Sequence, residues 1–203
     1  MKKTKENLVL FSGIFHSVNV WGGLLSYLGA EYNNIVKISP YKEAKNLNPD
    51  KEYIAITTSY GYREYLKYRD KYTFKKGIHI SPAQCVRNHK VLENLVKKMV
   101  KYIPQEYILE PNIFNSFRFL TGDNYCNEPA IFYSNIKNKE NIKIMSDLKE
   151  VEDTVIQGDI YITNKKDRLV KVLESHKEFE SGHNAILYNN NLFNYIKREI
   201  KLC

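Results

Sequence analysis

A cysteine and a histidine in the second half of the chain have the residue types of a nucleophile and its base. Cys126 follows a Gly-Asp-Asn turn, and His183 precedes a short apolar run. A thiolate beside an imidazole is a competent nucleophile, and Asn194 could orient the imidazole ring. Because most single cysteines are chemically inert, a buried Cys126 without a role is the competing interpretation.

Two lysines and a glutamate indicate a different chemistry, the binding of a nucleotide. Lys137 and Lys139 precede a predicted helix, where cations could neutralise a diphosphate leaving group. Glu174 could accept hydrogen bonds from ribose hydroxyls. The alternative for the lysines is a solvated loop, since lysine is common on protein surfaces.

Two glycines lie where an open parallel sheet binds its ligands. Gly22 and Gly23 come after the first predicted strand, in a loop at the carboxyl end of that strand. Glycine lets the backbone approach a ligand closely, although an ordinary turn is the alternative interpretation. The chain contains no Gly-x-Gly-x-x-Gly, Walker A, His-Glu-x-x-His or Gly-x-Ser-x-Gly signature.

These residues must be positioned by alternating strands and helices. Strands followed by helices favour an α/β fold with mainly parallel sheets. We expect two small Rossmann-like lobes, residues 1–111 and 112–203, with the boundary near Pro111. The predicted strands are residues 7–12, 35–39, 52–57, 77–81, 106–109, 129–135, 158–163 and 185–188. The predicted helices are a segment that opens at residues 21–23 and closes at Gly29, residues 84–102, 141–152 and 168–175, and a terminal helix after Asn191.

Composition limits the class of protein. The 203 residues are 43% hydrophobic and 27% charged, which is typical of a globular chain. Three widely spaced cysteines predict neither a disulfide framework nor a zinc site, and no apolar run is long enough to span a membrane, so we expect a cytoplasmic protein. The net charge of +8 favours an anionic partner such as nucleic acid or an anionic surface, and a generally basic proteome is the alternative explanation.

Read in order, the second half resembles the C-terminal lobe of GT-B retaining glycosyltransferases of the family 4 type, which use nucleotide-sugar donors. The similar segments are residues 107–117, which match the crossing between lobes, residues 130–142, which match the diphosphate-binding segment, residues 158–174, which match the segment with paired glutamates, and residues 181–188, which match a Gly-x-Asn-Gly-Leu strand. The chain has Ser134-Asn135 in place of the family's Gly-Arg pair, and of the two glutamates it keeps only Glu174.

This resemblance implies a GT-B-like fold and a transferase that moves a sugar from a nucleotide-sugar to an acceptor. DNA or a surface glycan would suit the basic charge as the acceptor. No cofactor and no metal are implied, because the nucleotide-sugar is itself the substrate. The implied site residues are Glu174 for catalysis and Gly22, Gly23, Asn135, Lys137 and Lys139 for donor binding.

Three alternatives stay open. The order Cys126, Gly158-Asp159, His183 and a polar residue such as Asn194 resembles papain-like cysteine hydrolases. Residues 53–61 and 78–82 have a flavodoxin-like pattern, with residues 58–61 where a loop beside the flavin would lie. The third alternative is a non-enzymatic protein that binds nucleic acid.

Overall fold

One parallel sheet forms the centre of the molecule. The computed structural model describes residues 6–16, 18–29, 32, 34–41, 47–102, 121–122, 135 and 137–203. Within them, six strands pair in the order β2-β1-β3-β4-β6-β8, and every neighbouring pair is parallel. The six strands are β1 (Asn7–Phe11), β2 (Asn34–Ile38), β3 (Glu52–Thr58), β4 (Thr73–Ile80), β6 (Ile160–Asn164) and β8 (Lys177–Phe179).

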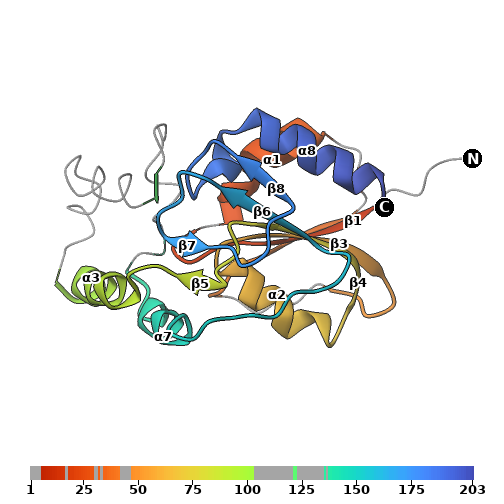
Figure 1. The fold of residues 1–203 in the computed structure, drawn as a ribbon. Coiled ribbons are helices and arrows are strands. Elements are labelled where there is room, and N and C mark those ends of the chain that lie inside the picture. Colours follow the sequence, from red (N-terminus) through yellow and green to blue (C-terminus); the bar gives the residue numbers. More distant parts are fainter. Residues whose placement is uncertain are drawn as a thin grey trace, which may run out of the picture.

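Helices cover both faces of this sheet (Figure 1). Helices α1 (Gly22–Leu28) and α8 (Asn190–Lys201) lie together on one face, and α2 (Gly61–Arg69) lies on the other. Two short helical turns, η1 (Val18–Trp21) and η2 (Ala185–Leu187), pack against α1. No helix in the described part of the chain is long and apolar enough to cross a membrane.

Alternation along the strands explains why both faces are covered. In β1, Leu8 and Leu10 pack under α1 and α8, whereas Val9 and Phe11 pack under α2. All four side chains are fully buried. Successive side chains of a strand point to opposite faces, so an uninterrupted apolar run requires a layer of helices on each side.

A third group of apolar side chains lies beyond the carboxyl ends of the strands. Helices α3 (His89–Tyr102) and α7 (Glu140–Asp147) pack against each other there (Figure 1). Their buried side chains contact Phe15, Tyr60 and Ala83, which follow β1, β3 and β4 respectively. The antiparallel pair β5 (Cys85–Val86) and β7 (Val170–Lys171) lies at the same edge. This edge of the sheet is therefore covered.

The prediction of an α/β fold with a mainly parallel sheet is confirmed, and the prediction of two GT-B-like lobes is wrong. Strand β6 from the second half pairs directly with β4 from the first, so one sheet includes strands of both halves. Hydrogen bonding between β4 and β6 makes their apolar faces continuous, which leaves no separate second core on that side. The expected boundary at Pro111 lies outside the described residues.

Local predictions were also corrected in the second half. The expected helix at residues 168–175 contains strand β7, and the expected strand at residues 185–188 is the helical turn η2. Strand β8 was not predicted. Each of these segments has only a few apolar residues, and such short runs do not distinguish strand from helix. The strands expected at residues 106–109 and 129–135 lie outside the described residues, apart from Asn135.

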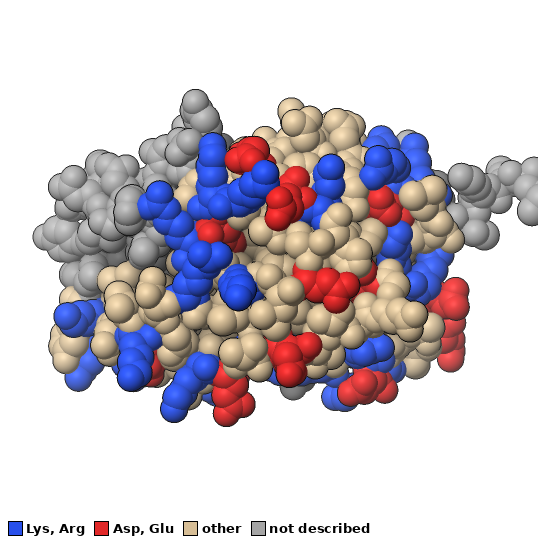
Figure 2. Space-filling view, in the orientation of Figure 1, with Lys and Arg blue, Asp and Glu red and all other residues tan. Residues whose placement is uncertain are grey.

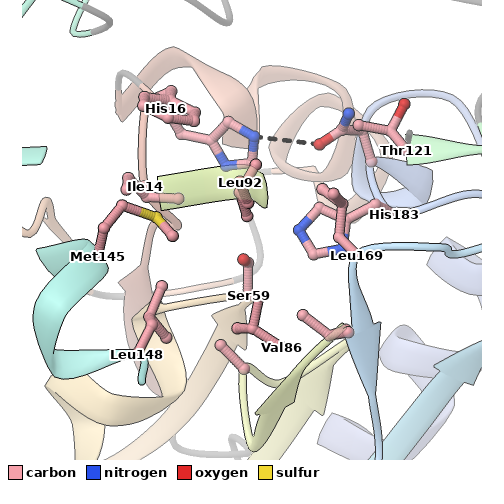
Figure 3. Close-up of a pocket in the computed structure, with 14 residues that line it drawn as sticks. Ile14, His16, Ser59, Val86, Leu92, Thr121, Met145, Leu148, Leu169 and His183 are labelled. Carbon is pink, nitrogen blue, oxygen red and sulfur yellow. Dashed lines mark hydrogen bonds between the residues drawn. The ribbon is translucent and has the colours of Figure 1, made fainter. Parts of the chain in front are cut away.

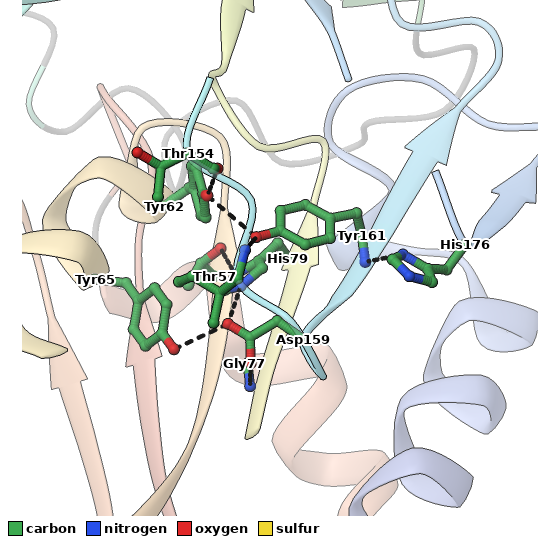
Figure 4. Close-up of polar contacts among 10 residues, drawn as sticks. Thr57, Tyr62, Tyr65, Gly77, His79, Thr154, Asp159, Tyr161 and His176 are labelled. Atoms are coloured by element: carbon green, nitrogen blue, oxygen red, sulfur yellow. Dashed lines mark hydrogen bonds and ion pairs between the residues drawn. The ribbon is translucent and has the colours of Figure 1, made fainter. Parts of the chain in front are cut away.

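A buried polar cluster joins β3, β4, β6 and α2 (Figure 4). Asp159 accepts hydrogen bonds from the Gly77 backbone N–H at 2.6 Å and from the Tyr65 hydroxyl at 3.0 Å, and it lies 3.1 Å from Nε2 of His79. The other ring nitrogen of His79 lies 3.1 Å from the Thr57 hydroxyl. These hydrogen bonds lower the pKa of Asp159 despite its burial, so the carboxylate stays charged and satisfied inside the protein.

We expect Asp159→Asn to lower the free energy of unfolding by about 3 kcal/mol, because one oxygen becomes an NH₂ group that faces another donor. Urea denaturation followed by circular dichroism measures the loss. Asp153→Asn, at an exposed position six residues earlier, is the matched control and should change stability by less than about 0.5 kcal/mol. Equal stabilities for the two variants would contradict a structural role for the cluster.

Candidate active site

Ser59 stands in a strained turn between β3 and α2. Its φ angle is 53°, in the left-handed region that residues other than glycine rarely adopt. The turn is held by hydrogen bonds from Ser59 N to Ile80 O at 3.1 Å and from the backbone N–H groups of Tyr62 and Ala83 to Ser59 O at 3.2 and 3.0 Å. Strain of this kind persists only where the surroundings enforce it, and it is common at functional sites. Here it places the serine at the covered carboxyl edge of the sheet.

Two glycines make this turn possible. A Cβ atom on Gly61 would lie 2.2 Å from the backbone oxygen of Phe11, so only glycine lets α2 start this close to β1. A Cβ atom on Gly13 would lie 2.9 Å from the Cβ of Ser59. The loop after β1 therefore passes directly beside the serine.

Asp167 and His183 form a buried pair on the loops after β6 and β8. Nδ1 of His183 lies 2.7 Å from Oδ2 of Asp167, and both side chains are almost fully buried. The backbone N–H groups of Leu169 and Val170 donate to Oδ1 of Asp167, at 2.8 and 3.3 Å. The backbone N–H of His183 donates to the backbone oxygen of Thr121 at 2.7 Å. The carboxylate thus fixes the ring with Nδ1 as the protonated nitrogen, and Nε2 is the nitrogen that can accept a proton.

Ser59 and His183 line the same pocket (Figure 3). The pocket is narrow, with a volume of about 50 Å³. Among the described residues, its other polar side chains are His16, Thr121 and Asn184. The other described residues of the wall are apolar and include Ile14 after β1, Leu92 on α3, Met145 on α7, Leu148 at the C-cap of α7, and Leu169 and Val170 at β7.

A second histidine in this pocket is neutral. Nε2 of His16 lies 3.1 Å from the amide oxygen of Asn184. Burial and the nearby His183 lower the pKa of His16 to about 4. At neutral pH, His16 therefore adds hydrogen-bonding capacity to the pocket without adding charge.

The pocket and the pair beside it hold the residue types that nucleophilic catalysis requires. A serine hydroxyl is a weak nucleophile until a base takes its proton, and an imidazole held by a carboxylate is a suitable base. Serine, histidine and aspartate come here from the ends of β3, β8 and β6, three strands of one sheet. Within the described residues, no group of three or more His, Cys, Asp or Glu side chains could hold a metal ion.

Comparison with solved structures identifies the fold. The chain superposes on the carboxylesterase CesB from Bacillus subtilis with a TM-score of 0.63 and 11% identity, covering 99% of this chain and 85% of that one. An alpha/beta hydrolase fold protein from Burkholderia ambifaria matches with a TM-score of 0.61 and 11% identity, over 95% of this chain and 90% of that one. The chain has the α/β-hydrolase fold.

A third similar structure is BioG from Haemophilus influenzae, with a TM-score of 0.55 and 13% identity, covering 91% of this chain and 92% of that one. No protein-family model matches the sequence, and no curated protein sequence matches it either. In the α/β-hydrolase fold the serine stands on a sharp strand-to-helix turn, and the triad follows in the order serine, acid, histidine. Ser59, Asp167 and His183 have this position and this order.

The glycosyltransferase prediction is wrong, as is the alternative of a papain-like cysteine hydrolase, because the similar structures have the α/β-hydrolase fold. The resemblance to GT-B enzymes came from the strand and helix alternation that these α/β folds share. A degenerate motif in such a pattern does not identify a site.

The residues expected to bind a nucleotide-sugar are spread over different parts of the fold, with Gly22 and Gly23 on α1 and Lys137 and Lys139 before α7. Glu174 is exposed and lies 3.4 Å from His176, and Lys139 is exposed before α7. Lys137 donates to the backbone oxygens of Met99 and Val100 at the end of α3. Gly22 and Gly23 start α1, away from the pocket residues.

Three further predicted residues have separate positions. His183 lies in the pocket, and Asn135 donates to the backbone oxygen of His16 at 3.0 Å. Asn194, on α8, accepts a hydrogen bond from the hydroxyl of Tyr27 on α1. Cys126 lies outside the described residues. An anionic partner stays a prediction, since the Lys and Arg side chains in Figure 2 are spread over several parts of that face with acidic side chains between them.

Sequence reasoning missed Ser59 and Asp167. The segment Thr57-Thr58-Ser59-Tyr60-Gly61 keeps the serine and the last glycine of Gly-x-Ser-x-Gly but has Thr57 in place of the first glycine. The Thr57 hydroxyl lies in the buried cluster beside His79, which explains why a larger residue fits there. A search that allowed a small polar residue at the first position would have found the turn.

We expect Gly61→Ala to lower the free energy of unfolding by about 3 kcal/mol, because the added methyl collides with the backbone of β1. Gly22→Ala is the matched control, since a Cβ atom there meets nothing within 4 Å, and it should change stability by less than about 1 kcal/mol. Urea denaturation of both variants measures the difference. A tolerated alanine at position 61 would show that α2 can move away from β1.

We expect acid to destabilise the protein through His16. The folded state holds its pKa near 4, below the ordinary value of 6.5, so the unfolded chain takes up a proton first as the pH falls. His16 should therefore remove about 3 kcal/mol of stability between pH 6.5 and pH 4. His16→Gln keeps a donor toward Asn184, and its stability should fall less steeply across this window in urea titrations. Parallel curves for the two proteins would contradict the assignment.

Proposed function

We propose that the protein is a serine hydrolase that cleaves carboxylic esters with an apolar acyl group through an acyl-enzyme. The main support is that Ser59, in its strained turn, lines the same buried pocket as the hydrogen-bonded pair of Asp167 and His183. Two of the similar structures, CesB and the naproxen esterase from Bacillus subtilis, are named carboxylesterases. The order of serine, aspartate and histidine along the chain adds to this support.

The reaction starts with Oγ of Ser59 attacking the ester carbonyl carbon. Nε2 of His183 takes the hydroxyl proton, and the carboxylate of Asp167 stabilises the imidazolium that forms. The C–O bond to the leaving group then breaks, and His183 returns the proton to the departing alcohol. In the second half a water molecule attacks the acyl-serine, with His183 again as base, and the carboxylic acid leaves.

Two backbone N–H groups beside Ser59 can stabilise the negative oxygen of the tetrahedral intermediate. The backbone N–H of Tyr60 lies at the N-cap of α2, where N–H groups have no acceptor inside the helix. In the loop after β1, the Gly13 carbonyl accepts from His16 N at 3.3 Å, so the Ile14 N–H of the same planar peptide points the opposite way. With Gly13 against Ser59, the N–H groups of Tyr60 and Ile14 are the candidate donors.

The walls of the pocket decide which acyl groups fit. Leu92, Met145, Leu148 and Leu169 offer no hydrogen bonds, so a charged acyl group would be desolvated there without compensation. The small volume of the pocket favours an acyl group with a short or slender hydrocarbon chain. Acetate or butyrate esters of p-nitrophenol are therefore suitable probes.

We expect Ser59→Ala to lower kcat/KM for p-nitrophenyl butyrate by about 10⁴-fold or more, because it removes the nucleophile. Asp167→Asn should cost about 10³- to 10⁴-fold, since it leaves His183 in the wrong tautomer. A fluorophosphonate probe should label the unaltered protein on Ser59 and should not label the alanine variant. Ser26→Ala, at an exposed serine on α1, is the control and should behave as the unaltered protein. Labelling that survives Ser59→Ala would disprove the proposal.

A further inference from the structure

Four hydrogen bonds connect helix α7 with the loop that carries Phe15 and His16. The backbone N–H of Phe15 donates to the hydroxyl of Tyr41 at 2.7 Å. That hydroxyl donates to the side-chain oxygen of Asn141 at 2.5 Å, and Asn141 is fully buried at the start of α7. Its amide nitrogen donates to Asn135 O at 2.8 Å, and the Asn135 amide donates to His16 O at 3.0 Å. The connection therefore starts and ends on the loop after β1.

The loop needs such support. Phe15 has a φ angle of 68°, which costs energy for a residue with a side chain. The bond to Tyr41 holds the N–H of Phe15, and the bond to Asn135 holds the C=O of His16. Groups outside the loop therefore hold the backbone N–H of the strained Phe15 and the carbonyl of the residue that follows it.

Tyr41 is suited to its place in this connection. Burial raises its pKa above the ordinary value, so the hydroxyl stays protonated and can accept from Phe15 while it donates to Asn141. Phenylalanine would keep the ring but would leave a buried N–H and a buried amide oxygen without this partner. The loss would fall on the loop and on α7 together.

The position of the loop determines the position of the Ile14 N–H. Ile14 lies between Gly13, which packs against Ser59, and Phe15, whose N–H is held by Tyr41. Helix α7 also lines the pocket through Met145, and Leu148 at its C-cap lines the pocket as well. A helix that closes the pocket is therefore bonded to the loop beside the nucleophile.

We propose that Tyr41, Asn141 and Asn135 are positioning residues that hold the Ile14 N–H ready for the oxyanion while α7 covers the pocket. This inference rests on the proposed serine-hydrolase function. The three residues touch no reacting atom and act through the loop. Because the oxyanion exists only in the transition state, their effect should appear in kcat and leave KM almost unchanged.

The experiment compares Tyr41→Phe with Tyr27→Phe in hydrolysis of p-nitrophenyl butyrate. Tyr27 is a matched control, since its hydroxyl also donates to an asparagine side chain, Asn194, outside the pocket. We expect Tyr41→Phe to lower kcat by about 10- to 100-fold, with KM changed by less than about twofold. A trifluoromethyl ketone, which forms a tetrahedral adduct with the serine, should bind more weakly by the same factor as kcat falls. Tyr27→Phe should change none of these values.

Asn141→Ala tests whether the residues act together. The double variant with Tyr41→Phe should lose little more kcat than the single variants, because both changes break the same connection. If Tyr41→Phe does not fold, Asn135→Ala, at a partly exposed position, should still lower kcat and inhibitor affinity together.

The outcomes separate this inference from the proposed function. Absence of Ser59 labelling in the unaltered protein would overturn both. Normal labelling, together with an unchanged kcat in a folded Tyr41→Phe variant, would overturn the positioning role alone. A rise in KM at constant kcat would also overturn it, since it would show a role in ground-state binding.

Discussion

The close contact between the first turn of α2 and strand β1 is the constraint on which the candidate site depends. Gly61 lies so near the carbonyl of Phe11 that a methyl group cannot enter. The chain must therefore reverse direction within the two residues between β3 and α2, which forces Ser59 into the left-handed region. The same crowding brings the loop of Gly13 against the serine. Ser59 and the loop after β1 are thus placed by the same packing contact.

Polar groups near this contact are buried and hydrogen-bonded. Asp167 accepts from two backbone N–H groups and faces His183, and Asp159 has three donors in the cluster below. Burying these charged groups costs free energy of desolvation. Their geometry is kept nevertheless, because losing one hydrogen-bond partner would leave a buried charge without compensation. In the site, this rigidity keeps His183 in one tautomer. In the core, the hydrogen bond between Thr57 and His79 ties strand β3, which precedes Ser59, to strand β4.

The covered edge of the sheet gives the site its chemical character. Apolar side chains from α3 and α7 lie over the carboxyl ends of the strands and line a narrow space beside Ser59. Apolar surroundings of low dielectric constant strengthen each electrostatic interaction inside them. The hydrogen bonds through Tyr41 and Asn141 join that cover to the loop beside the nucleophile, so the packing of α7 and the geometry of the site are linked.

Sequence patterns determined the α/β class, the strands near residues 7–11, 34–38 and 52–58, and helices α3 and α8. These features depend on local periodicity, which the order of residues carries directly. Only the tertiary structure decided that one sheet includes both halves and that Ser59 lines one pocket with His183, the hydrogen-bonded partner of Asp167. The physical reason is that parallel pairing of β3, β4, β6 and β8 brings together residues more than 100 positions apart, and no local pattern encodes that pairing.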